Sequence, residues 1–106
     1  MNSRLRRYEI LLPLQFNDGR DVPSDFLADA VLEIVDRFEA ASYETQRVEG
    51  HWRHEGVLYR DTLVKIVIDV ADDESNRDWM RQYKSRWKGK LDQLNLWLVS
   101  YIIDID

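Results

Sequence analysis

Residues 94–105 read Leu-Asn-Leu-Trp-Leu-Val-Ser-Tyr-Ile-Ile-Asp-Ile, a stretch with apolar side chains at odd and even positions alike. Successive side chains of a strand point to opposite faces of the sheet, so a strand here would be apolar on both sides. A strand with one face in water alternates apolar and polar residues instead. A chain of 106 residues can cover one face of a sheet well, and we expect a second copy of the chain to cover the other. The candidate dimer interface is the row Trp97, Val99, Tyr101 and Ile103.

The rest of the chain contains three further strand patterns and two helix patterns. Residues 8–16, 46–53 and 63–70 alternate with a period of two, and helical spacing recurs over 27–38 and 79–87. The order βαββαβ predicts an α+β domain with a ferredoxin-like fold, in which a four-stranded antiparallel sheet carries two helices on one face. We expect the whole chain, residues 1–106, to form this single domain. The pattern leaves open whether two copies stack face to face or join edge to edge.

Local signals predict where the two helices begin and end. Ser24 follows Pro23 and is expected to cap the first helix. The stretch Ser75-Asn76-Arg77-Asp78 matches a capping box and is expected to open the second. Gly89 is the expected stop of that helix.

The composition excludes several classes of function. The chain has no cysteine, which rules out a disulfide framework, a thiolate zinc site and a cysteine nucleophile. The basic start Met-Asn-Ser-Arg leads into an alternating strand pattern rather than the apolar segment of a secretion signal, and no apolar run could span a membrane. We therefore expect a cytoplasmic protein without membrane contact. No catalytic motif, cofactor loop or closed metal site is recognisable, so we expect no cofactor.

The charge of the chain is uneven. The formal net charge is −5, yet residues 77–90 carry six basic side chains and one acidic one, a local net of +5. A candidate polyanion-binding strip on the second helix consists of Arg77, Arg81, Lys84 and Lys88. A nucleic-acid surface is one interpretation of this strip. A solvated face balanced by acidic neighbours is the favoured one, because the chain as a whole is acidic and phosphate contacts dominate nucleic-acid affinity.

The two histidines, His51 and His54, lie in a predicted hairpin near Glu49, Glu55 and Asp61. They could bind a metal or act as acid and base. Residues three apart on a strand point to opposite faces, however, so exposed polar side chains are the favoured interpretation.

The same hairpin offers a candidate ligand-binding group, Trp52, Tyr59, Asp61 and His51, which we expect at the junction of sheet and helices. In the functional interpretation, Gly50 would allow a ligand to approach the backbone closely. The alternative, which is favoured, is that Trp52 packs under a helix and Gly50 marks a bulge.

Several short motifs resemble those of a family of small uncharacterised bacterial proteins. They are Asn17-Asp18-Gly19, Gly50-His51-Trp52, Tyr83-Lys84-Ser85-Arg86-Trp87 and Gln93. The strand and helix order, with a second apolar sheet face, is similar to the dimeric α+β barrel built from ferredoxin-like subunits. The family has no assigned activity, and the chain lacks the lipid-acceptor cysteine found in the members that look like lipoproteins.

These observations favour a non-catalytic, homodimeric binding or interaction module over the other classes. One alternative is a small-molecule-binding protein or enzyme with its pocket near Trp52, Tyr59 and Asp61. The other is a nucleic-acid-linked regulator that uses the basic second helix.

Overall fold

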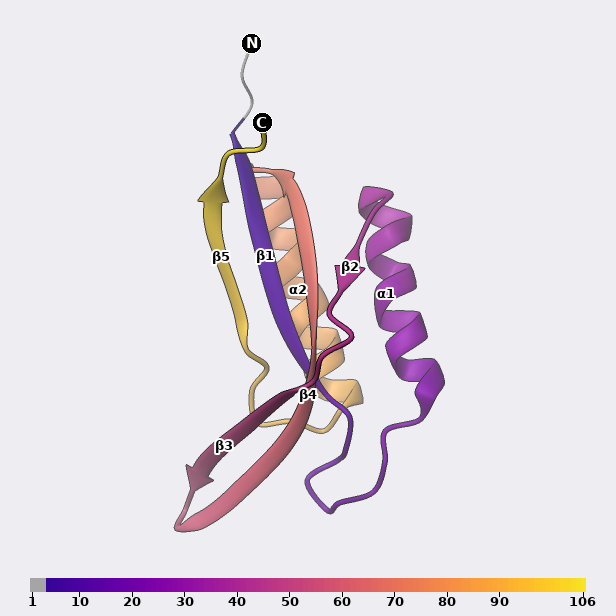
Figure 1. Ribbon diagram of the computed structural model, residues 1–106, viewed down its shortest axis with the longest axis vertical. Coiled ribbons are helices and arrows are strands. Elements are labelled where there is room, and N and C mark those ends of the chain that lie inside the picture. Colours follow the sequence, from indigo (N-terminus) through magenta and orange to yellow (C-terminus); the bar gives the residue numbers. More distant parts are fainter. Residues whose placement is uncertain (1–3) are drawn as a thin grey trace.

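The computed structural model describes residues 4–106 and has the predicted ferredoxin-like α+β architecture (Figure 1). Residues 1–3, the start of the basic N-terminal stretch, lie outside the described part. Two helices lie on one face of an antiparallel sheet, whose other face is open. The elements in chain order are β1 (Leu5–Pro13), α1 (Ser24–Phe38), β2 (Ser42–Tyr43), β3 (Val48–His54), β4 (Val57–Ala71), α2 (Glu74–Lys90) and β5 (Leu98–Ile103). None of the helices in residues 4–106 is long and apolar enough to cross a membrane.

The strand order is β2-β4-β1-β5, with β3 also paired to β4. The sheet has five strands rather than the four expected, because the two-residue strand β2 precedes β3, which corresponds to the strand predicted over residues 46–53. Tyr43 lies opposite Ile66 and Val48 lies opposite Leu63, so five steps along one chain match three along the other. The extra residues break the ladder into β2 and β3, which pair with different halves of the long strand β4.

The core lies between the helices and one face of the sheet. Even-numbered residues of β1 and β4 point to this face, and their partners come from the inner stripes of α1 and α2. The largest side chains that are almost completely buried are Trp87, Tyr83, Ile10, Ile34, Ile66, Ile68, Met80, Leu91 and Val64.

Two hydrogen bonds join the helices inside this core. The hydroxyl of Tyr83 donates to the carbonyl oxygen of Ala30 over 2.8 Å, and Nε1 of Trp87 donates to Oε2 of Glu33 over 3.0 Å. Burial raises the pKa of Tyr83 well above its usual value. The aromatic stripe of α2 therefore serves the core, and α1 accepts the hydrogen bonds of Tyr83 and Trp87.

The predicted helix starts need correction. Ser24 is the first residue of α1 rather than its cap; the cap position is Pro23, and no side chain bonds the first turn there. In α2, Asp73 takes the cap position expected of Ser75, since its Oδ1 accepts the backbone N–H of Asn76 over 2.8 Å. A carboxylate at this position also favours the positive end of the helix dipole. The helix runs past Gly89 to Lys90.

The last strand is shorter than its apolar stretch. β5 covers residues 98–103, and residues 94–97 form the connection from α2. Leu96 is buried under the helices, which explains an apolar residue outside the strand. The backbone N–H of Leu11 donates to the carbonyl oxygen of Trp97 over 3.0 Å, so the main chain of Trp97 is fixed beside β1.

Candidate functional site

The open face of the sheet carries a band of charge across its centre. Odd-numbered residues of β1, β4 and β5 point to this face. Nε of Arg7 donates to Oδ1 of Asp69 over 2.7 Å, and Nζ of Lys65 lies 3.5 Å from Oε1 of Glu9. The hydroxyl of Tyr101 hydrogen-bonds to the same Glu9 carboxylate. The charged side chains at the centre of the face are thus paired with one another. The apolar side chains beside them are the part of this face that remains available for a partner.

The predicted interface row lies on this open face, along β5. Tyr101 and Trp97 are 43% and 64% exposed, while Val99 and Ile103 are half-buried. Ile105, just past the strand, is 61% exposed. An indole that is two-thirds exposed contributes little to the folding of its own chain, so this row is apolar surface that the monomer leaves in water.

The hairpin formed by β3 and the first half of β4 extends away from the helices as an arm (Figure 1). Within the arm Trp52 stacks on Tyr59, with ring centroids 4.4 Å apart and planes inclined by 16°. Nε1 of Trp52 donates to Oδ2 of Asp61 over 2.6 Å, and Asp61 is 9% exposed. The structure thus brings these three predicted residues together, on the continuation of the open face rather than under a helix.

A pocket of about 280 Å³ lies where the arm meets the connection before β5. Trp52 and Asp61 form one wall, Trp97 and Leu94 form another, and Leu11 and Leu63 form part of its apolar lining. Gly50 borders this region, and a Cβ built at Gly50 would lie 3.0 Å from Cδ1 of Leu63. The pocket joins the predicted ligand group to Trp97 of the predicted interface, a combination that strand patterns alone do not reveal.

His51 lies on the opposite face of the arm from these residues. It pairs across the hairpin with Arg60, and its Nε2 is 3.8 Å from Oε1 of Glu49. Nε2 of His54 is 3.8 Å from Oε1 of Glu55. Within residues 4–106 no group of three or more metal-ligating side chains converges. The two histidines are therefore separate surface groups of the arm.

The four predicted polyanion-binding residues of α2 divide into two groups. Arg77, Arg81 and Lys84 line a pocket between α2, β1 and β5, whereas Lys88 lies outside it. Sequence patterns missed the partners that this pocket takes from β1, Arg6 and Tyr8. Arg6 and Tyr8 lie at even positions of β1, as the inward-facing Ile10 does. This alternation is the sequence feature that could have indicated them.

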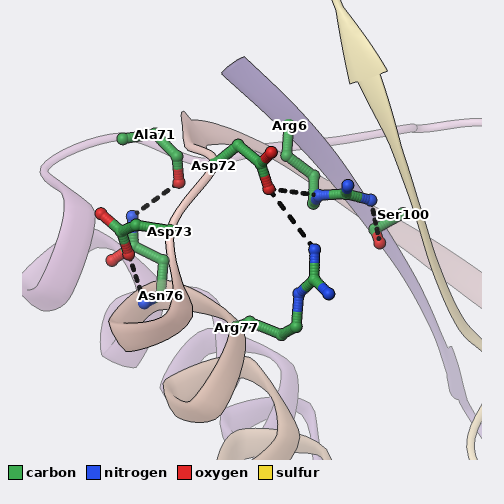
Figure 2. Close-up of polar contacts among 7 residues, drawn as sticks. All are labelled: Arg6, Ala71, Asp72, Asp73, Asn76, Arg77 and Ser100. Atoms are coloured by element: carbon green, nitrogen blue, oxygen red, sulfur yellow. Dashed lines mark hydrogen bonds and ion pairs between the residues drawn. The ribbon is translucent and has the colours of Figure 1, made fainter. Parts of the chain in front are cut away.

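Arg6 joins three elements at one end of this pocket (Figure 2). Its Nε donates to Oδ1 of Asp72 over 2.8 Å and its Nη1 donates to Oγ of Ser100 over 3.0 Å. Arg77 approaches the same Asp72 oxygen at 3.5 Å. The hydrogen bond from Arg6 lowers the pKa of Asp72 below its usual value.

This lowered pKa predicts a loss of stability in acid. Because the folded-state pKa of Asp72 lies below the unfolded value of about 3.9, its contribution is present above that value and disappears as pH falls through the folded pKa. Thermal melts from pH 7 down to pH 3 should show Tm falling below about pH 4. Asp72→Asn should have a lower Tm at pH 7 and a smaller further loss in acid; an unchanged slope would show that Asp72 does not contribute.

Comparison with known proteins identifies the fold but no family. No protein-family model and no curated protein matches the chain. Among solved structures, a phage SAM lyase in complex with S-methyl-5′-thioadenosine has a TM-score of 0.71 and 14% identity, covering 99% of this chain and 93% of the lyase. CutA from Synechococcus elongatus has a TM-score of 0.61 and 8% identity over 96% of this chain and 79% of its own. The divalent ion tolerance protein CutA1 from Ehrlichia chaffeensis has a TM-score of 0.63 and 6% identity, covering 100% and 87%. At these identities the likeness supports the ferredoxin-like fold alone.

Proposed function

We propose that this protein is a non-catalytic interaction module that forms a homodimer by pairing β5 with β5 of a second copy. The observation that carries the proposal is the exposed row on the open face, led by Trp97 at 64% exposure. Exposed aromatic groups of this kind are the residues that dominate binding energy when they are buried in an interface.

The two edges of the sheet differ in a way that favours β5. The opposite edge is interrupted between β2 and β3, and β3 carries charged residues such as Glu49 and Arg53. Interruptions and charges are common protections against pairing with another chain. β5 reads Leu-Val-Ser-Tyr-Ile-Ile, with no charge and no proline, and has no outer partner strand within residues 4–106.

A second copy fits this edge because the row is complementary to itself. In an antiparallel pair around a two-fold axis that keeps both open faces on the same side, directly opposite residues must share a face. With the axis at Tyr101, Val99 lies opposite Ile103 of the second copy. Trp97 then lies opposite Ile105, so these two exposed apolar side chains become cross-strand neighbours and bury part of each other's surface.

The mass of the protein in solution tests this proposal. Size-exclusion chromatography with light scattering at low micromolar concentration should give twice the 12.7 kDa of one chain. Dilution should shift the population toward the single chain, since the interface includes one strand pair and a few side chains. A constant mass of one chain at all concentrations would reject the homodimer.

A second candidate function is the binding of a small aromatic molecule in the open-face pocket. Trp52 and Trp97 offer ring faces, and Oδ1 of the Asp61 carboxylate is left to accept a hydrogen bond once Oδ2 has accepted from Trp52. A purine that bears an amino group matches this combination of apolar walls and one acceptor. Dimerisation and ligand binding would then share Trp97.

Tryptophan fluorescence can detect such a ligand. S-methyl-5′-thioadenosine, which is bound by the phage lyase of similar fold, is the probe to use. It should quench the signal saturably, and Asp61→Asn should weaken binding by about tenfold through loss of a charge-assisted hydrogen bond. Arg53→Gln, on the other face of the arm, is the matched control. Equal affinities for Asp61→Asn and the wild type would remove Asp61 from the site, and the absence of quenching at millimolar probe would reject the candidate.

A further inference from the structure

We infer that the pocket between α2, β1 and β5 binds a compact oxyanion, the phosphate group of a small molecule. The pocket has a volume of about 340 Å³ and is lined by Arg6, Tyr8, Arg77, Met80, Arg81, Lys84, Leu98 and Ser100. Four of these side chains are cationic and none is acidic. All of them come from one chain, so the inference does not depend on the homodimer.

The cations around the pocket come from two elements, β1 and α2. Arg6 comes from β1, while Arg77, Arg81 and Lys84 occupy successive turns of α2. Asp72 holds Arg6 and touches Arg77 from the end of the pocket (Figure 2). The guanidinium of Arg6 is thereby fixed by Asp72 and Ser100, and its side chain is only 17% exposed. A guanidinium held in place by a carboxylate and a hydroxyl is a preorganised donor.

The remaining cations keep donors available for a ligand. The contacts of Arg77 with Asp72 and of Arg81 with Asp78 are both 3.5 Å, the limit of a hydrogen bond. Lys84 makes no ion pair within residues 4–106. An oxyanion between these groups could therefore accept hydrogen bonds without breaking a strong internal pair.

A buried hydroxyl without a partner is the second, independent sign of a ligand. Tyr8 is 3% exposed, and its hydroxyl is the buried side-chain atom that has no hydrogen-bond partner in residues 4–106. Tyr8 lines the pocket together with Arg77. A buried O–H without an acceptor is unfavourable, and native proteins satisfy nearly all such groups. An oxygen of the bound group, inserted between Arg77 and Tyr8, would supply the acceptor.

The geometry favours a small phosphorylated molecule over a nucleic-acid chain. Three cations of α2 and Arg6 of β1 border one pocket that is partly open to solvent, whereas Lys88, one turn further along α2, is not part of it. A polyanion would need contacts along a surface, and the rest of this acidic chain has a net charge that opposes them.

Titration calorimetry with inorganic phosphate at low salt tests the inference on the full chain. We expect saturable binding of one phosphate per chain. Lys84→Ala should weaken it by about tenfold, because a charge-assisted hydrogen bond is lost. Lys88→Ala removes the same charge from the same helix outside the pocket and should leave the affinity within about twofold, the residual long-range effect of one screened charge.

Tyr8→Phe distinguishes phosphate binding in the pocket from a general effect of positive charge, since it removes one hydroxyl and no charge. It should weaken phosphate binding several-fold while the Tm of the free protein stays equal or rises, because an unsatisfied buried group is removed. Absence of binding at millimolar phosphate would overturn the inference. So would equal losses in Lys84→Ala and Lys88→Ala, or tighter binding of a single-stranded oligonucleotide that depends on Lys88.

Discussion

Replacing Trp87 with alanine should lower the free energy of unfolding by about 3–5 kcal/mol. Trp87 is 1% exposed and lies between the helices, where its ring meets Phe26 and Tyr83. The substitution leaves a cavity in the core and removes the donor that Glu33 accepts. Chemical denaturation at low protein concentration, where the single chain predominates, measures the loss.

Trp97→Ala is the matched control for this experiment, since it removes the same side chain from the surface. Trp97 is 64% exposed, so its loss should change the stability of the single chain by no more than about 0.5 kcal/mol. At high concentration Trp97→Ala should lose more stability than at low concentration, because dimerisation stabilises only the wild type. Equal losses for Trp87→Ala and Trp97→Ala in the single chain would contradict the core described here.

Tyr101→Lys should convert the homodimer to single chains, raising the dimer Kd by roughly 100-fold or more. With the two-fold axis at Tyr101, each copy places this residue directly opposite its counterpart. The substitution replaces two facing aromatic rings with two facing ammonium groups, and like charges at opposed positions of a sheet are unfavourable. Within one chain the new ammonium can approach Glu9, the present partner of the Tyr101 hydroxyl, so the fold should be kept.

Leu32→Lys on α1 controls for the effect of adding a charge at an exposed apolar position. Leu32 is 55% exposed and lies on a helix, away from β5. It should leave the Kd unchanged in sedimentation velocity runs. If Tyr101→Lys stays as dimeric as Leu32→Lys, dimerisation does not use β5.

The sequence predicted the ferredoxin-like fold because its periodicities report burial directly. Ile66, Ile68 and Tyr83 lie in the core at the spacings expected of strand and helix. The boundaries of the helices and strands were harder to predict from the sequence. The capping of α2 by Asp73 instead of Ser75 depends on which of two good cap residues the loop places first, and both satisfy the local rule.

The candidate sites were only partly predictable, since they combine residues far apart in the chain. Trp52, Tyr59 and Asp61 were found because a hairpin pairs them locally. Their approach to Trp97 depends on how the arm leaves the sheet, which no local pattern encodes. His51 is close to them in the sequence, but the alternation of the strand puts it on the other face. Arg6 and Tyr8 carried no motif at all, and only the packing of α2 over β1 shows their role.

Single-cysteine crosslinking tests the pairing of β5 most directly, because the natural chain contains no cysteine. Opposed residues of antiparallel strands have Cβ atoms about 4.5–5.5 Å apart, within reach of a disulfide after slight adjustment. With the axis at Tyr101, Tyr101→Cys should form a disulfide-linked dimer under mild oxidation. Val99→Cys should not, because the two Val99 positions are four residues out of register, about 13 Å apart. Failure of Tyr101→Cys to crosslink, or equal crosslinking of both variants, would contradict the proposed homodimer.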